Sequence, residues 1–275
     1  MNKEFKVLAR PYMVWLSILV FVPILAMILI SISNLNSSVS VGDLVISFSH
    51  FKLLLESSTL IAFRNSLFFA TLTTLFSFVL GYFIAYEIKL SRFKNKFILL
   101  TIVILPMWSN LILRTESLAN IMSENNILKS ILGFNLFGNI SGTGAAVLFG
   151  LVFTYMPFMI LSVYTALEKI DFALEEAALD LGLSPIKKFW KVVFPLSLKG
   201  VVTGSIMVFL PTLAGFAIPK ILSRGRIVFI GTIIENKFVY TNYNHGALLA
   251  VVILFFILGS ILLLTKFDKE GETLL

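Results

Sequence analysis

The sequence predicts an all-α membrane protein with six transmembrane helices, both termini in the cytoplasm, and a cytoplasmic helix between the fourth and fifth spans. Three observations predict this fold. Hydrophobic residues make up 58% of the 275 residues and charged residues only 13%, whereas a soluble domain carries about 25% charge. The apolar residues gather in long runs, as helices in lipid require. Lysines and arginines are concentrated in alternate connecting segments, which is the pattern that orients a membrane protein.

Six apolar segments reach the length of about 20 residues that a spanning helix needs. They comprise residues 12–33, 62–88, 97–121, 144–167, 200–222 and 246–266. The first follows a basic stretch, as the apolar part of a signal peptide does. It exceeds the usual length of roughly 7–15 residues for such a part, and no small-residue cleavage site follows it. We therefore expect a retained spanning helix there.

The third segment differs from the others because polar groups interrupt it. Pro106 breaks the apolar run, and Asn110, Arg114 and Glu116 follow. Charged groups inside a span are costly and usually face the protein interior, so the outer half of this segment is not expected to face lipid. Extension of Arg114 to the outer membrane interface is an equally good alternative for that residue. We predict that a substrate pathway is lined by Trp108, Asn110, Glu116 and Tyr155.

The basic residues orient these spans. If the N-terminus lies inside, the inner segments hold 14 lysines and arginines and the outer segments hold 5. The inner residues are Lys3, Lys6, Arg10, Lys89, Arg92, Lys94, Lys96, Lys169, Lys187, Lys188, Lys191, Lys199, Lys266 and Lys269. This bias predicts that both termini and the segment 171–195 are cytoplasmic. Because topology accounts for the net charge of +7, we predict no nucleic-acid partner.

Composition also argues against several kinds of site. The chain has no cysteine, which excludes disulfides and thiolate metal ligands. Its two histidines, His50 and His245, are far apart in the sequence, so we predict no metal site and no catalytic residues. No GxxxxGK[ST] loop is present, so the chain is not expected to bind ATP by that route.

The segment 171–195, DFALEEAALDLGLSPIKKFWKVVFP, is a polar interruption between the fourth and fifth spans. Asp171 is placed to cap a short helix, with Glu175 and Glu176 near the positive end of its dipole. Gly182 stands where helices commonly end in a left-handed residue. The helix would carry an apolar face made of Leu174, Ala177, Ala178 and Leu181, and acids on another face at Glu176 and Asp180.

A second short helix is predicted directly after Gly182. Ser184-Pro185 has the sequence of an N-cap followed by the first helical residue. Apolar side chains then alternate with lysines at helical spacing, namely Ile186, Phe189, Trp190 and Val193 against Lys187, Lys188 and Lys191. A helix with one apolar side and one basic side suits a membrane surface. Two short helices bent at a glycine indicate a docking element.

Gly200 and Gly204 form a GxxxG pair in the fifth segment. Such pairs allow two helices to approach closely. The pattern predicts a tight contact, and it fits a contact with another subunit as well as it fits packing within the chain.

At the segment 171–195 the sequence resembles a known family. Glu176-Ala177-Ala178, Gly182 and Phe194-Pro195-Leu196 are similar to the EAA loop of ABC-transporter permease subunits. In that family the loop is a cytoplasmic coupling helix seated in a groove of the ATPase subunit. The resemblance implies that coupling to an ATPase involves Glu175, Glu176, Ala177, Ala178, Asp180, Gly182 and Pro195.

The resemblance extends from about residue 64 to residue 266. Arg64-Asn65-Ser66-Leu67, Leu105-Pro106-Met107-Trp108 and Tyr155-Met156-Pro157-Phe158 are similar to the spermidine/putrescine permease branch, to the first of its two permeases. Pro219-Lys220 departs from the Pro-Asp often found there, which weakens the inference of a cationic substrate. The implied domains are an N-terminal spanning helix with an outer loop (1–60), an ABC permease transmembrane domain (61–267) and a cytoplasmic tail (268–275).

The family resemblance implies a non-enzymatic subunit of an ATP-driven importer in the bacterial cytoplasmic membrane, with polyamines as the expected substrate. The expected partners are an ABC ATPase dimer, a second homologous permease, an external substrate-binding protein and the lipid bilayer. This chain is expected to hold no cofactor, because ATP and Mg would be bound by the ATPase.

Two alternatives remain at this point. The first is an ABC importer of the same kind that carries another small solute, such as a metal ion, an oxyanion or a sugar. An ion-coupled secondary transporter is the second, but it would be expected to carry more buried acids than the one glutamate, Glu116, that interrupts the third segment. A membrane enzyme would need a cluster of His, Asp and Glu, which this sequence lacks.

Overall fold

The structure is a computed structural model that describes residues 3–33, 46–124, 127–133 and 138–265. The predicted tail at 268–275 and much of the predicted outer loop before residue 60 lie outside these ranges. Within them every regular element is helical, and the one isolated β-bridge joins Ser33 and Ile46. The helices before the predicted coupling segment are α1 (Lys3–Ser31), the 3₁₀ helix η2 (Ser49–Leu55), α2 (Ser57–Leu90), α3 (Lys96–Ile104), the 3₁₀ turn η3 (Leu105–Trp108), α4 (Leu111–Ile121), α5 (Ile127–Leu132) and α6 (Gly144–Glu168).

The helices from the predicted coupling segment onward are α7 (Phe172–Asp180), α8 (Pro185–Lys188), the π-helical turn η4 (Phe189–Val193), α9 (Phe194–Ala214), α10 (Ala217–Leu222), α11 (Ile230–Val239) and α12 (Tyr243–Thr265). Among the described residues, five helical segments are long and apolar enough to cross a bilayer. The pair formed by α3–η3 and α4 makes a sixth if it counts as one span, and it bends by 93° at its break. The all-helical membrane fold is thus confirmed with five or six candidate spans, and the side on which the termini lie stays a prediction.

The fifth span differs from its predicted bounds of 200–222. The apolar helix runs from Pro185 to Ala214, so it begins inside the predicted coupling segment. The π turn η4 ends two residues before Pro195, and a wider turn relieves the clash that a proline ring makes with the carbonyl four residues earlier. At the other end Gly215 is extended, with ψ at 150°, and the chain leaves the helix there. Residues 217–222 form the separate helix α10.

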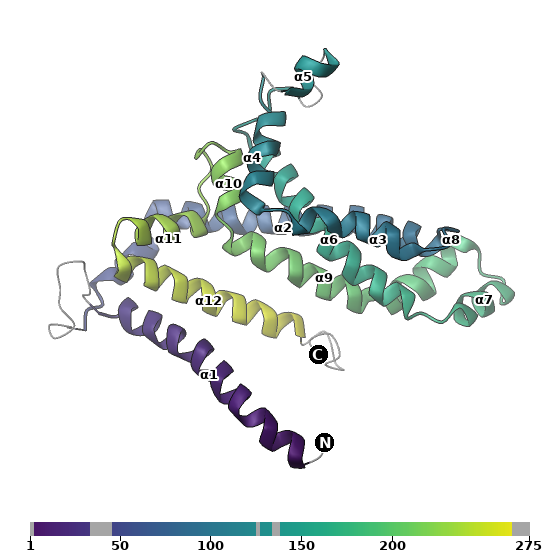
Figure 1. Cartoon of the computed structure of the whole chain (residues 1–275), viewed down its shortest axis with the longest axis horizontal. Coiled ribbons are helices and arrows are strands. Elements are labelled where there is room, and N and C mark those ends of the chain that lie inside the picture. The colour runs from purple at the N-terminus through teal and green to yellow at the C-terminus, as the bar shows by residue number, and fades with distance from the viewer. Residues whose placement is uncertain (1–2, 34–45, 125–126, 134–137, 266–275) are drawn as a thin grey trace. The chain divides into compact units, whose positions relative to one another are not determined.

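The chain divides into two compact units, one of which comprises Ala62–Gly231 and Gly259–Leu275. In this unit α6 and α9 run side by side over much of their lengths (Figure 1). One core cluster joins α2, α6 and α9 around Tyr82, Met159 and Val163. A second cluster lies toward the other end of α6, where α4 and α10 pack against it.

The contact between α6 and α9 depends on glycine. A Cβ at Gly200 would lie 2.5 Å from the Cβ of Ala166 and 2.8 Å from the Ser162 carbonyl oxygen, and one at Gly204 would lie 2.6 Å from the Met159 sulfur. The Ser162 hydroxyl donates to the Gly200 carbonyl at 2.8 Å. The GxxxG pair therefore serves packing within the chain.

The other unit comprises Met1–Ile61 and Thr232–Leu258. Its polar contacts gather at the start of α12. The buried side chain of Asn244 donates to the Ser33 carbonyl at 2.8 Å, and a ring nitrogen of His50 lies 3.0 Å from one of His245. Glu235 lies in α11 and is half-buried.

Candidate functional site

The first helix of the segment 171–195 forms as its sequence predicts. The Asp171 carboxylate accepts a hydrogen bond from the Ala173 amide at 2.9 Å and caps α7. At the other end the Leu183 amide donates to the Ala178 carbonyl at 3.1 Å and the Gly182 amide to the Leu179 carbonyl at 2.8 Å. This pair of bonds is a Schellman motif, which satisfies the last carbonyls of the helix.

Gly182 is the left-handed residue of that motif. Its φ is +82°, and a Cβ placed there would meet no atom within 4 Å. Space is therefore free at this position, and the backbone conformation alone favours glycine. The prediction that Gly182 ends the helix and sets its angle to the next one is consistent with this conformation.

The second helix also begins as predicted. The Ser184 hydroxyl accepts from the Lys187 amide at 3.4 Å, and Pro185 occupies the first turn. The helix continues through η4 into α9 without a loop. Phe189 lies against Tyr86 of α2, with ring centroids 5.1 Å apart, and against Tyr82, 5.7 Å apart. The second helix is therefore a rigid extension of a span.

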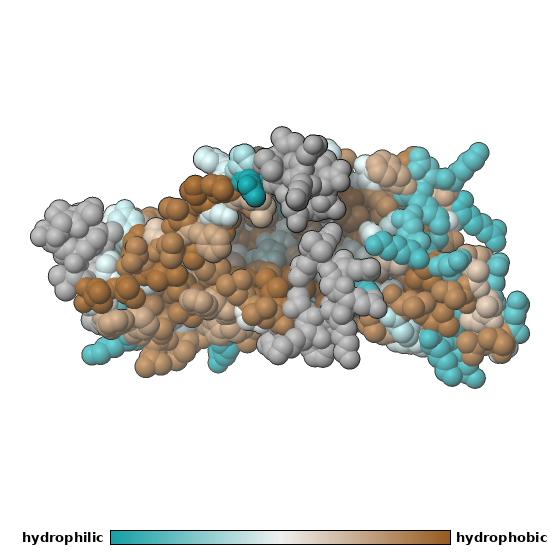
Figure 2. Space-filling view, turned by 90° about the horizontal axis from the view of Figure 1, so that it is seen from below, coloured by the Kyte–Doolittle hydropathy of each residue, from teal (hydrophilic) through white to brown (hydrophobic). Residues whose placement is uncertain are grey.

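The outer surface of α7 and α8 is exposed and partly apolar. Leu174 is 50% exposed, Leu181 85% and Ile186 74%, so most of the predicted apolar face of α7 is exposed, and Ala178 is its one buried member. Hydrophilic side chains gather at the end of this unit that holds α7 and α8 (Figure 2). Most of the predicted coupling residues lie at the surface, namely Glu176, Ala177, Asp180, Gly182 and Pro195, whereas Ala178 is buried. An exposed surface of this mixed kind suits a protein partner.

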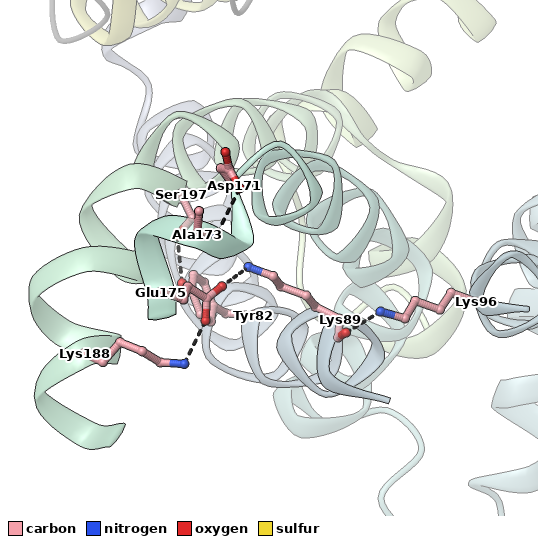
Figure 3. A network of polar contacts seen from close by, with 8 residues as sticks. All are labelled: Tyr82, Lys89, Lys96, Asp171, Ala173, Glu175, Lys188 and Ser197. Atoms are coloured by element: carbon pink, nitrogen blue, oxygen red, sulfur yellow. Dashed lines mark hydrogen bonds and ion pairs between the residues drawn. The ribbon is translucent and has the colours of Figure 1, made fainter. Parts of the chain in front are cut away.

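Glu175 is placed differently, because its side chain is only 2% exposed. One carboxylate oxygen accepts from Lys89 of α2 at 2.5 Å, and the other accepts from Lys188 of α8 at 2.8 Å. The two lysines reach the carboxylate from opposite sides (Figure 3). Glu175 therefore lies buried against α2 and α8 and is not part of the exposed surface. Its role in coupling would be to position the segment.

The two lysines determine the charge of Glu175. Burial by itself raises the pKa of a carboxyl group, but the hydrogen bonds and charges of Lys188 and Lys89 more than offset this, and the pKa of Glu175 lies below its ordinary value of 4.5. The carboxylate is ionised at neutral pH, which makes the group a buried cluster of three charges.

This lowered pKa predicts a pH dependence. Ion pairing of Glu175 contributes stability above the ordinary carboxyl pKa of 4.5, and that stability is lost as pH falls through the lower pKa of the folded protein. We expect Glu175→Gln to lower the Tm of the purified protein from pH 8 to about pH 5.5, and the difference from wild type to shrink below about pH 4. Thermal unfolding at each pH measures this. A difference that stays constant to pH 3, or that Glu176→Gln reproduces, would contradict it.

The break between η3 and α4 is held by polar groups. The Asn110 side chain accepts from the Ile112 amide at 2.9 Å and the Leu113 amide at 3.2 Å, and so caps α4. The half-buried guanidinium of Arg114 donates to the Pro106 carbonyl. Arg114 thus reaches back to the break.

The predicted pathway residues do not form one cluster. Trp108 is 89% exposed at the break, and Asn110 and Glu116 are exposed on or beside α4. Tyr155 is half-buried on α6. These exposed polar and aromatic groups would need a partner subunit to enclose them, so their role as pathway residues stays a prediction.

Sequence reasoning missed two groupings. Lys89 and Lys188 lie 86 and 13 residues from Glu175, and His50 and His245 are 195 residues apart, so no local spacing indicates either pair. For the first grouping, the only signal in the sequence is that two lysines and an acid stand in segments predicted to be cytoplasmic. In the described part of the chain no group of three or more His, Cys, Asp or Glu could hold a metal ion.

Comparison with known proteins identifies the family. Residues 77–266 match the family described as binding-protein-dependent transport system inner membrane component. The chain is 28% identical over 262 residues to the spermidine/putrescine transport system permease protein PotB of Haemophilus influenzae, covering 91% of this chain and 89% of that protein. It is 30% identical over 228 residues to PotB of Escherichia coli, covering 82% of each.

The fold agrees with this match. A chain in the crystal structure of a bacterial alginate ABC transporter, in complex with a periplasmic protein that holds an alginate pentasaccharide, superposes with a TM-score of 0.78. The match covers 96% of this chain and 93% of that chain at 16% identity, so it bears on the fold alone. From the family match and the shared fold, the chain belongs to the inner membrane components of binding-protein-dependent transport systems, the multi-pass and non-catalytic permease subunits of ABC importers.

Proposed function

We propose that this chain is a polyamine permease subunit that couples to an ABC ATPase through the segment 171–195. The observation that carries the coupling proposal is the exposed surface of α7 and α8, which bears Glu176 and Asp180 beside the apolar residues Leu174 and Leu181. The similarity to PotB supports spermidine or putrescine as the solute. The proposed partners are an ATPase dimer that binds ATP and Mg, a second homologous permease and an external binding protein.

The proposal requires α7 and α8 to face the cytoplasm. We expect a cysteine introduced as Lys94→Cys, in the exposed connection between α2 and α3, to be shielded from a membrane-impermeant maleimide in intact cells and labelled after permeabilisation. The chain has no native cysteine, so the signal comes from this site. Labelling in intact cells would refute the orientation and with it the docking role of α7 and α8.

The substrate is tested by transport. Proteoliposomes holding the complete importer, with binding protein added, are expected to take up labelled spermidine or putrescine only when ATP is enclosed on the ATPase side. In the same assay Trp108→Ala and Glu116→Gln are each expected to lower uptake about tenfold while assembly persists, if these residues line the pathway. Leu113→Ala, another exposed residue of α4, is the control. Full uptake by both variants would remove Trp108 and Glu116 from the pathway.

One observation favours a second candidate, an anionic solute carried by the same machinery. Lys220 is exposed on α10, where polyamine permeases often have an acid, and α10 packs against α4, which carries Arg114. A positive charge in place of that acid suits an anion better than a polyamine. Competition in the uptake assay separates the two, because an excess of spermidine blocks transport only of a polyamine, whereas sulfate or phosphate blocks transport of the corresponding oxyanion.

A further inference from the structure

We propose that Glu175 is a positioning residue that fastens the coupling segment to the end of α2, so that α2 moves together with α7 and α8. This inference rests on the proposed coupling function of the segment. It assigns the motion to a particular span and to three side chains, Lys89, Glu175 and Lys188.

The geometry joins three helices at one carboxylate. Lys89 stands in the last turn of α2, and its Nζ lies 2.5 Å from Oε1 of Glu175. Lys188 ends α8, and its Nζ lies 2.8 Å from Oε2. The lysine side chains are 13% and 14% exposed. Because each oxygen takes a different lysine, the carboxylate holds α7 to α2 and also closes the angle between α7 and α8 around Gly182.

The attachment continues into the next helix. The Lys96 ammonium at the start of α3 donates to the Lys89 carbonyl at 2.5 Å (Figure 3). The end of α2 is therefore fixed both to the coupling segment and to the broken span that carries Trp108 and Arg114. A displacement of α7 would reach that span through two polar contacts.

Further contacts with α2 come from the second half of the segment and from α9. Tyr82 and Tyr86 of α2 pack against Phe189, and the Tyr82 hydroxyl lies 2.7 Å from that of Ser197. The remaining buried residue of α7 is Ala178, whose methyl group gives a non-directional contact. Glu175 is thus the group on α7 that fixes its position relative to α2 by directional bonds.

A role in stability alone accounts poorly for these charges. A buried ion cluster is often no more stabilising than well-packed apolar residues of similar volume, because its ions lose their hydration. This chain has abundant apolar residues, and 58% of it is hydrophobic. Directional bonds to both oxygens give what apolar packing does not, which is a fixed orientation between helices.

The first test compares Glu175→Gln with Glu176→Gln in the complete importer. We expect Glu175→Gln to keep ATPase binding and ATP hydrolysis but to lower the solute transported per ATP hydrolysed roughly tenfold or more, the size of a typical coupling between sites. Glu176→Gln, on the exposed side of the same helix, is expected to weaken ATPase binding instead. An unchanged transport ratio in Glu175→Gln overturns the positioning role. Full ATPase binding in Glu176→Gln speaks against the docking proposal instead, so the two failures are distinguishable.

A second test does not depend on the stability of one variant. Lys89→Cys with Glu175→Cys removes the attachment, and a flexible bismaleimide can replace it, since two long side chains separate the backbones and exceed the reach of a disulfide. In a complex whose partners lack cysteine, we expect the double variant to transport poorly and cross-linking to restore the transport ratio at least severalfold. Each single cysteine variant treated with the reagent is the control. Cross-linking that leaves transport low or abolishes it shows that α2 and α7 do not move together.

Discussion

Substitution of Gly182 by valine is expected to uncouple the permease from its ATPase. Gly182 has a φ of +82°, and the left-handed conformation costs an L-residue roughly 1–2 kcal/mol, with a further penalty for a branched side chain. Because no atom lies within 4 Å of its Cβ position, the cost is conformational and not steric. The valine variant should turn α8 relative to α7 and weaken ATPase binding about tenfold or more, with Gly182→Ala affected less. Co-purification of the ATPase and ATP hydrolysis by the reconstituted complex measure this.

Two variants separate the backbone effect from other causes. Gly182→Asn is expected to stay close to wild type, because asparagine tolerates the left-handed region far better than valine does. Gly133 after α5 has a φ of +77° and equally open space, so Gly133→Val imposes a similar conformational cost away from the coupling segment and should leave ATPase binding unchanged. If Gly182→Val binds the ATPase as wild type does, the angle at Gly182 is unimportant for docking.

Local features of the coupling segment could be predicted from the sequence. The caps at Asp171 and Ser184 and the left-handed Gly182 depend on residues within three or four positions of one another, and such short-range preferences are visible in the order of residues. The break in the third span was predictable for the same reason, because Pro106 and Asn110 act on their own backbone. These signals fix where helices begin and end.

Long-range pairings could not be predicted in this way. Glu175 and Glu176 are both acids in the first half of one helix, and the sequence gives no reason to bury the first and expose the second. The choice is made by Lys89, 86 residues earlier, which stands at the end of another span. The predicted start of the fifth span at residue 200 is wrong because Pro195 does not end the helix, which the π turn at Phe189–Val193 carries through it.

Substitution of Gly200 by leucine is expected to prevent folding of the isolated chain. Even a Cβ at this position would lie 2.5 Å from Ala166 Cβ and 2.8 Å from the backbone oxygen of Ser162, and the backbone of α6 cannot move aside as a flexible side chain can. Overpacking of this kind typically costs about 1–3 kcal/mol and occasionally more. Separation of the helices would also break the bond from the Ser162 hydroxyl to the Gly200 carbonyl. Gly200→Ala should show a smaller loss, and the yield of monodisperse protein after detergent extraction measures both.

Expression of the chain without partner subunits distinguishes packing within the chain from a contact with a second permease. Leu198→Phe enlarges an exposed position of the same helix, where the side chain is 42% exposed, and is expected to give a normal yield. If the GxxxG pair served a contact with a second permease, Gly200→Leu alone would also fold normally and fail only when the complex assembles. Because the contact lies between α6 and α9 of one chain, loss of folded protein is expected before any partner is present, and a normal yield of Gly200→Leu would show that this pair of helices does not pack as described.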